Sequence, residues 1–266
     1  MWNETVFLFA TSLYLLLLFL SLIMTPFRQR FLFPATMIVF SVHTFALIVR
    51  WIESYKIGFG HAPLSNYYES LVIFSWCITG IALILRKKLI SNIIYLLAIG
   101  GSFLIMAYAN LSPTIDREIR PLLPALQSNW LHIHVLTCFI AYASFFLSFI
   151  CGVLFFFHSK GPIPNLLVLD RINYTSASIG FIFLTLGILS GSVWAHYAWG
   201  SYWSWDPKET WSLITWIIYA VLLHGRFVRG WTEKRLALLS IIGFLSVLFT
   251  YFGVNFLLSG LHSYAT

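Results

Sequence analysis

The segment 199–211 holds the residues most able to bind a ligand, because four tryptophans and one tyrosine fall within thirteen positions. Long apolar runs flank this segment on both sides, so we expect it to lie at a membrane face. Aromatic rings at that depth can form an ordinary interfacial belt, but such a belt needs only a few rings. The higher density indicates a platform for a large, flat ligand, formed by Trp199, Tyr202, Trp203 and Trp205.

Asp206 follows these rings, and two compatible roles are open for it. With Pro207 and Glu209 it forms the D-x-x-E capping-box pattern with proline at the first helical position, which predicts a helix start. In the first role, the two acids simply accept hydrogen bonds from the backbone N–H groups at the helix start. A capped helix end is also a rigid place to hold a ligand, so Asp206 is a candidate binding residue as well.

Two histidines are expected at the same outer level as the aromatic segment. His134 opens the predicted fifth helix, and His262 follows the eighth. Two neutral imidazoles that face each other over an aromatic surface are what axial ligation of haem iron requires. Zinc and copper sites usually take three or more protein ligands and do not need tryptophans. The pattern therefore predicts a haem site with His134 and His262 as iron ligands.

His132 competes with His134 for the first of these positions. Residues two apart on a helix lie on different faces, so only one of the two side chains is expected to point inward. His61 and His196 also lie in outer connections, where hydrogen-bonding roles are equally compatible with their positions. The residues alone leave these alternatives open.

Two further histidines lie deeper in the predicted spans. His224 stands near the inner end of the seventh helix, two residues before Arg226. One alternative is an interfacial histidine beside an arginine that belongs to the inner-side positive charge. The other is one iron ligand of a second, inner haem position, with Arg226 near a propionate. His43 and Arg50, seven apart, share a face of the second helix. Their spacing is compatible with a buried cofactor path and equally with a hydrogen bond between helices.

The composition identifies an integral membrane protein. Of 266 residues, 59% are hydrophobic and 9% are charged, whereas soluble proteins are about 25% charged, and the mean hydropathy is +0.85. We expect an all-α fold with about eight transmembrane helices, forming a single polytopic domain over 1–266. The first run lacks a basic n-region and a cleavage site, so it is expected to be a retained span. The spans are predicted at about 5–24, 34–52, 69–85, 89–109, 131–157, 174–195, 211–225 and 236–259.

The distribution of Lys and Arg over the connections predicts the orientation. Eleven of them fall on one side and five on the other, which places both termini and the Trp-rich loop on the outer side. The net charge of +7 is then mostly topological, so no nucleic-acid partner is expected. The inner set is Arg28, Arg30, Arg86, Lys87, Lys88, Lys160, Arg171, Arg226, Arg229, Lys234 and Arg235, and the outer set is Arg50, Lys56, Arg117, Arg120 and Lys208.

The three cysteines, Cys77, Cys138 and Cys151, all lie inside predicted helices without a C-x-x-C pair. This arrangement does not fit a disulfide framework, a thioredoxin-like redox motif or a zinc site. We expect them to act as small apolar packing residues.

At these residues the chain resembles the CcsA/ResC family of cytochrome c biogenesis proteins. The Trp-rich segment, at about 196–216, is similar to the WWD signature of that family. The family's outer-histidine motif places its ligand before Val, which favours His134 over His132. The other resembling segments are 61–70, with His-Ala-Pro-Leu; 223–226, with Leu-His-Gly-Arg; 251–255, with Tyr-Phe-Gly-Val-Asn; and 261–264, with Leu-His-Ser-Tyr.

The resemblance implies a role in System II cytochrome c biogenesis. Such proteins work with a CcsB/ResB-type partner in a holocytochrome c synthase, or haem lyase, complex. They carry haem b to an outer site, where it is joined to the C-x-x-C-H thiols of apocytochrome c, and a thioredoxin-like protein keeps the thiols reduced. The sequence contains no C-x-x-C-H, so the chain is expected to be a carrier or catalyst. No catalytic residue is assigned beyond haem positioning. The membrane is then expected to be a bacterial cytoplasmic membrane or, for a plastid-encoded chain, a thylakoid membrane.

Two other classes compete with this interpretation. A CcmC-type protein delivers haem to a chaperone without attaching it, and it shares the Trp segment and the flanking histidines. Such proteins resemble this chain but have about six spans, so eight spans favour the synthase branch. A haem-free channel or structural subunit is the remaining alternative, and a Soret band in the purified protein would exclude it.

Overall fold

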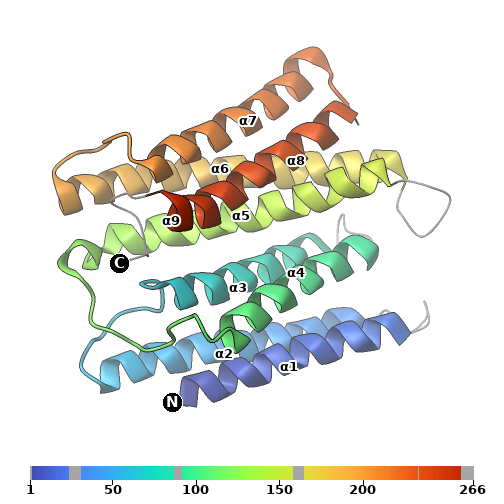
Figure 1. The fold of residues 1–266 in the computed structure, drawn as a ribbon. Helices are drawn as coiled ribbons and strands as arrows, with labels where there is room; N and C mark the ends of the chain where they lie inside the picture. The colour runs from blue at the N-terminus through green and yellow to red at the C-terminus, as the bar shows by residue number, and fades with distance from the viewer. Residues whose placement is uncertain (1, 24–30, 87–91, 158–164, 233, 259–266) are drawn as a thin grey trace. The chain divides into compact units, whose positions relative to one another are not determined.

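The computed structural model describes residues 2–23, 31–86, 92–157, 165–232 and 234–258 (Figure 1). Within these ranges the fold is helical, and eight helices are long and apolar enough to cross a membrane, which confirms the all-α membrane fold. The helices are α1 (Trp2–Ile23), α2 (Leu32–Lys56), α3 (Tyr67–Arg86), α4 (Asn92–Leu111), α5 (Asn129–Phe156), α6 (Leu166–Trp199), α7 (Pro207–Arg229) and α8 (Lys234–Leu248), with a short 3₁₀ turn, η2 (Pro124–Leu126), a π-helical turn, η3 (Phe249–Gly253), and α9 (Val254–Leu257).

Two helices extend several residues beyond the apolar runs that predicted them. Helix α6 has 34 residues, whereas the hydropathy pattern predicted only 174–195. Its additional first turns contain Asp170, whose carboxylate is 2.8 Å from the guanidinium of Arg226 in α7. Because its charge is paired, Asp170 can lie within the helix, although hydropathy alone would leave these turns outside the predicted span. Helix α7 begins at Pro207, as the capping residues predicted and four residues before its apolar run at 211.

The chain divides into two compact units, Met1–Leu126 and Gln127–Thr266. In the first, α1 contacts α2 and α4, and α3 contacts both α2 and α4. In the second, α5 contacts α6 and α8, and α7 packs against the same two helices, α6 and α8 (Figure 1). The prediction of a single domain over 1–266, and that of outer termini, stay predictions. The basic residues Arg28, Arg30, Lys87, Lys88 and Lys160, on which the orientation partly rests, lie outside the described residues.

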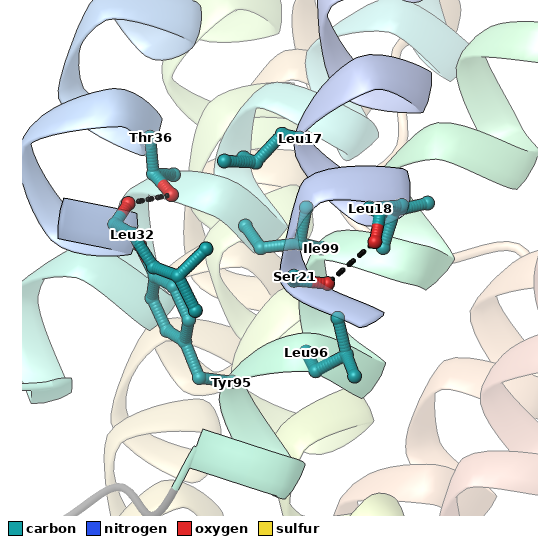
Figure 2. A pocket seen from close by; sticks show the side chains of 8 residues that line it. All are labelled: Leu17, Leu18, Ser21, Leu32, Thr36, Tyr95, Leu96 and Ile99. Carbon is teal, nitrogen blue, oxygen red and sulfur yellow. Dashed lines mark hydrogen bonds between the residues drawn. The ribbon is translucent and has the colours of Figure 1, made fainter. Parts of the chain in front are cut away.

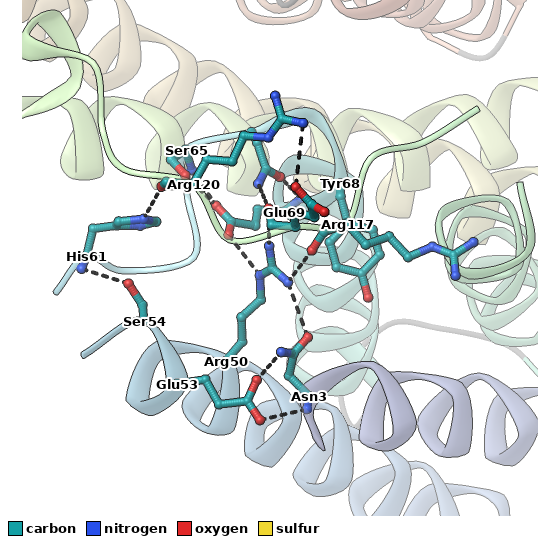
Figure 3. A network of polar contacts seen from close by, with 12 residues as sticks. Asn3, Arg50, Glu53, Ser54, His61, Ser65, Tyr68, Glu69, Arg117 and Arg120 are labelled. Atoms are coloured by element: carbon teal, nitrogen blue, oxygen red, sulfur yellow. Dashed lines mark hydrogen bonds and ion pairs between the residues drawn. The ribbon is translucent and has the colours of Figure 1, made fainter. Parts of the chain in front are cut away.

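One end of the first unit is held together by a buried ion pair (Figure 3). The Nε of Arg50 donates to Glu69 Oε1 at 2.8 Å, and both side chains are 1% exposed. The same guanidinium donates to Asn3 Oδ1 at 3.2 Å and to the carbonyl of Arg117 at 3.0 Å. Glu69 Oε2 in turn accepts from the backbone and the hydroxyl of Ser65, at 2.8 and 2.7 Å. Helices α1, α2 and α3 and two connections therefore meet at one charged pair.

The connection 112–121 runs without a helix in the structure. The three-residue turn η2 follows it. The carbonyls of Arg117 and Glu118 accept hydrogen bonds from the guanidinium of Arg50, at 3.0 and 3.5 Å. His61 also fixes this connection, since its Nε2 donates to the carbonyl of Arg120 at 2.9 Å.

His43 lies in the core of the first unit, as its helical position predicted. Its side chain is fully buried, and Nδ1 is 3.2 Å from the hydroxyl of Tyr14 in α1. Tyr14 is also 2.8 Å from Thr79 Oγ1, which donates to Ser102. These contacts match the alternative of a hydrogen bond between helices. The predicted cofactor role of His43 gains no support from them.

A small cavity in the same unit is lined by residues of α1, α2 and α4 (Figure 2). Its volume is about 10 Å³, which is room for about one water molecule. Thr36 and Ser21, both on its wall, donate their hydroxyls to carbonyls of their own helices, at 2.8 and 2.6 Å. The cavity is therefore far too small for a porphyrin.

The buried ion pair gives a prediction about stability. Replacing Arg50 by Ala leaves the Glu69 carboxylate buried without its charge partner, so the free energy of unfolding should fall by about 3–5 kcal/mol. The matched control is Arg120→Ala, which removes a pair with Asp116 whose side chains are 69% and 50% exposed, and it should cost less than about 1 kcal/mol. Denaturant unfolding in detergent measures both values. Equal losses for the two variants would contradict the assignment.

Candidate functional site

His134 is fixed in the second unit by a hydrogen bond between two helices. Ser128 caps the start of α5 by accepting from the backbone N–H of Trp130, which places His134 in the second turn. The Nδ1 of His134 is 2.8 Å from the carbonyl oxygen of Gly187 in α6. A carbonyl only accepts, so Nδ1 carries the proton and, in the neutral ring, the lone pair is on Nε2. This arrangement is usual for histidines that bind metals.

Glycines on α6 allow this close approach. A Cβ at Gly191 would be 2.5 Å from Nδ1 of His134, and a Cβ at Gly187 would be 2.7 Å from the sulfur of Cys138. Cys138 lies one turn beyond His134, with Sγ 3.7 Å from Nδ1. The two glycines form a G-x-x-x-G pattern, which lets membrane helices pack closely. This spacing can be read from the sequence, where it predicts close packing of α6, but it lies within a long apolar run and was not among the candidate features.

His134 packs against Trp194, a residue outside the candidates drawn from the sequence. The two rings are stacked, with centroids 5.9 Å apart and an interplanar angle of 19°. Trp194 is 4% exposed and meets Trp199 edge-on at 4.8 Å. It lies inside α6, before the Trp-rich connection. Through Trp194, the predicted ligand histidine is connected to the predicted aromatic platform.

The Trp-rich connection begins where α6 ends at Gly200, whose φ of +77° closes the helix in a left-handed cap. Tyr202 stacks on His196 at 4.2 Å, and Trp203 meets Trp205 edge-on at 5.7 Å. Tyr202 and Trp205 are 57% and 69% exposed, so these rings form an accessible surface.

Trp205 also has an unusual backbone, with φ +59°. This left-handed conformation is rare for a large side chain, and such strain occurs often at functional sites.

The acids after these rings anchor α7, as the capping pattern predicted. Asp206 Oδ1 accepts from the backbone of Lys208 at 2.9 Å, and Glu209 Oε2 accepts from the backbone of Asp206 at 3.2 Å. Glu209 also accepts from the backbone N–H of Ser204 at 2.8 Å. Both acids are buried, at 7% and 9% exposure. The cap therefore fixes the end of the Trp-rich connection as well as the start of the helix.

The other outer histidines lie in different surroundings. His262, the second predicted iron ligand, lies outside the described residues, so its pairing with His134 stays a prediction. His132 is partly buried on α5, while His196 is exposed and stacked on Tyr202. His61 lies in the first unit, 5% exposed.

The segment that precedes His262 has an irregular helix. Residues Phe249–Gly253 form the π-helical turn η3, and the ring of Phe249 packs on Trp211 at 4.2 Å. Tyr251 meets Phe139 of α5 edge-on at 5.7 Å. π-Helical turns are rare and frequently lie at functional sites. The turn that begins the motif at 251–255 therefore contacts α7 through Phe249 and α5 through Tyr251.

His224 lies in an open groove on α7 with a volume of about 470 Å³. This volume is in the range of roughly 300–1,000 Å³ typical of ligand pockets. Arg226 does not line the groove, because its guanidinium pairs with Asp170 and donates to the carbonyl of Trp231 at 3.0 Å. The lining residues are Trp216, Ile217, Ala220, Val221, His224, Gly225, Arg229 and Trp231.

The geometry defines a polytopic membrane protein that holds a histidine of fixed tautomer beside clustered tryptophans. Comparison with known proteins assigns it further, because residues 64–262 match the family described as cytochrome C assembly protein. The chain belongs to this family, which confirms the resemblance drawn from its motifs.

Relatives and a solved structure agree with this assignment. The cytochrome c biogenesis protein CcsA of Chlamydomonas reinhardtii is 45% identical over 232 residues, which cover 82% of this chain and 64% of that protein. The CcsA of Mesostigma viride is 39% identical over 267 residues, covering 88% and 86%. The structure of the cytochrome c haem lyase CcmF matches with a TM-score of 0.68 at 16% identity, covering 94% of this chain and 45% of that one. At this identity the likeness to CcmF establishes the fold alone.

The clearance at Gly191 gives a prediction about His134. In Gly191→Ala the new methyl group overlaps the imidazole, so the bond from Nδ1 to Gly187 should break. The control is Gly180→Ala on the same helix, whose methyl group would be 2.5 Å from Phe145 Cδ1. Both variants should lose about 1–3 kcal/mol from overpacking. Side-chain ¹⁵N NMR of histidine should show a changed His134 tautomer or protonation state only in Gly191→Ala. An unchanged His134 spectrum in that variant would contradict the assignment.

Proposed function

We propose that this chain binds haem at its outer face and positions it for covalent attachment to apocytochrome c. The observation that carries the proposal is the hydrogen bond from His134 Nδ1 to the carbonyl of Gly187. It prepares Nε2 as an iron ligand at the level of the Trp-rich connection. Membership in the cytochrome c assembly family and the names of the CcsA relatives support the same activity.

His134 and His262 would ligate the iron from opposite faces. The Nδ1–H donation to a carbonyl raises the basicity of the ligand and fixes the orientation of its ring. Trp194 limits the rotation of His134 by stacking on it. The exposed rings of the Trp-rich connection would pack along the porphyrin, and the capped start of α7 would hold them there. We therefore assign to the protein the tasks of binding and orientation.

The reaction itself needs little from protein side chains. As substrate, haem supplies two vinyl groups, and each thiol of the C-x-x-C-H motif adds its S–H across one of them. One carbon–sulfur bond forms, the proton goes to the neighbouring carbon, and no group leaves. Holding two thiols against two vinyl groups in a single pose is the main contribution of the enzyme. The iron-binding histidines keep the porphyrin in that pose, and the histidine of the substrate motif then displaces one of them as the product leaves.

A CcsB/ResB-type membrane protein and apocytochrome c are the proposed partners, and haem b is the proposed substrate. A thioredoxin-like protein that reduces the thiols completes the proposed set. His224, exposed in the groove on α7, would be the iron ligand of the inner haem position before transfer. The membrane is the bacterial cytoplasmic membrane or the thylakoid membrane.

The experiment is expression of the chain with its CcsB/ResB-type partner and an apocytochrome. We expect His134→Ala and His262→Ala each to lower the yield of haem-stained cytochrome by at least about tenfold, because each removes an iron ligand. Both should also alter the Soret band of the purified protein. His132→Ala, two residues from His134, is the matched control and should keep at least half of the yield.

Two outcomes would contradict the proposal in different ways. Unchanged bound haem and unchanged yield in both variants would exclude this site. Bound haem that depends on His134, combined with a yield that never exceeds that of cells without the chain, would identify a haem carrier that does not support attachment.

A further inference from the structure

The groove on α7 is built from two adjacent rows of side chains spaced four residues apart. One row consists of Trp216, Ala220 and His224, and the other continues through Gly225 to Arg229. Residues four apart lie above one another on a helix, so the rows are neighbouring ridges. His224 ends the first row, and Arg229 ends the second about 7.5 Å further along the axis. An imidazole and a guanidinium therefore lie in the same groove.

Two indole rings at the groove are fixed by contacts elsewhere in the second unit. The Nε1 of Trp216 donates to Thr185 Oγ1 in α6 at 2.9 Å. Trp231 packs on Gly225, whose lack of a side chain leaves room for the ring, and its backbone N–H donates to the Gly225 carbonyl at 3.0 Å. Arg235 lies over the Trp231 ring at 5.3 Å. The groove thus has aromatic walls whose positions are set independently of any ligand.

The two arginines near the end of α7 have different tasks. Arg226 is held by Asp170, by the carbonyl of Trp231 and by the ring of Tyr174, whose centroid is 5.7 Å away. It therefore fixes the Trp231 wall and does not reach the groove. Arg229 is exposed and lines the groove. The predicted position of Arg226 near a propionate is thus better suited to Arg229.

We propose that Arg229 recognises the carboxylates of the porphyrin that His224 binds, and that Arg226 is a positioning residue for the Trp231 wall. This inference rests on the proposed function, because it takes haem as the ligand. The chemistry fits the groove: a flat apolar ring needs aromatic walls, and a carboxylate is bound well by a guanidinium, often through two hydrogen bonds. An arginine that only helped to orient the protein in the membrane would not distinguish a porphyrin with free carboxylates from one with esterified carboxylates.

The test is a porphyrin-binding titration of the full-length chain in nanodiscs. The background carries His134→Ala and His262→Ala, so that the proposed outer ligands do not contribute. Three probes separate the contacts: haem, metal-free protoporphyrin IX and haem dimethyl ester. Arg229→Gln is compared with Arg171→Gln, which removes one exposed arginine on α6 outside the groove. His224→Ala serves as the variant that removes the metal-binding side chain.

We expect Arg229→Gln to weaken haem and protoporphyrin IX by about tenfold, since both carry free carboxylates, and to leave the dimethyl ester within about twofold. His224→Ala should weaken haem and the ester but not protoporphyrin IX, and Arg171→Gln should change none of them. Equal affinity for protoporphyrin IX of the background chain with and without Arg229→Gln, or an equal loss for the ester, would overturn the role of Arg229. Absence of binding by all three probes would overturn the groove as a porphyrin site. The cytochrome yields of the His134 and His132 variants judge the outer site separately.

Discussion

A bilayer offers no water to polar groups, so each polar side chain in a spanning helix must find its partner inside the protein. In the first unit this constraint explains why Arg50 and Glu69 form a buried pair that also binds two connections. In the second unit it explains the pair of Asp170 and Arg226 between α6 and α7. The same constraint fixes His134, because the carbonyl of Gly187 satisfies its Nδ1. Each of these polar contacts therefore joins two helices of one unit.

The candidate site depends on one of these contacts more than on any other. Gly187 supplies the carbonyl, and Gly191 leaves the space in which the imidazole of His134 can lie. Trp194, three residues further along α6, covers the ring and leads to the Trp-rich connection. A single stretch of α6 thus orients the histidine and begins the aromatic surface. The helix packing of the second unit is in this way linked to its proposed chemistry.

Much of the fold could be predicted from the sequence, because long apolar runs and a capping box are local signals. The start of α7 at Pro207 followed from the side chains of Asp206 and Glu209. The placement of His43 and Arg50 on one face of α2 followed from their spacing, and the structure buries both side chains. Their partners did not, since Tyr14 and Glu69 lie on other helices and hydropathy carries no information about pairing.

The site was predicted less completely, for the same reason. His134 could be selected by its position, but the roles of Gly187, Gly191 and Trp194 could be assigned only once α5 and α6 were packed together. The difference between Arg226 and Arg229 likewise depends on Asp170, which is more than fifty residues away in the sequence.

The central claim is that His134 is an iron ligand whose orientation is set by α6. It is tested most directly by an experimental structure of the native chain with haem and its CcsB/ResB-type partner bound. We predict His134 Nε2 on the iron, with Nδ1 still donating to the carbonyl of Gly187, and His262 on the opposite face. Haem at the outer face ligated by other side chains, with His134 turned away from the iron, would contradict it.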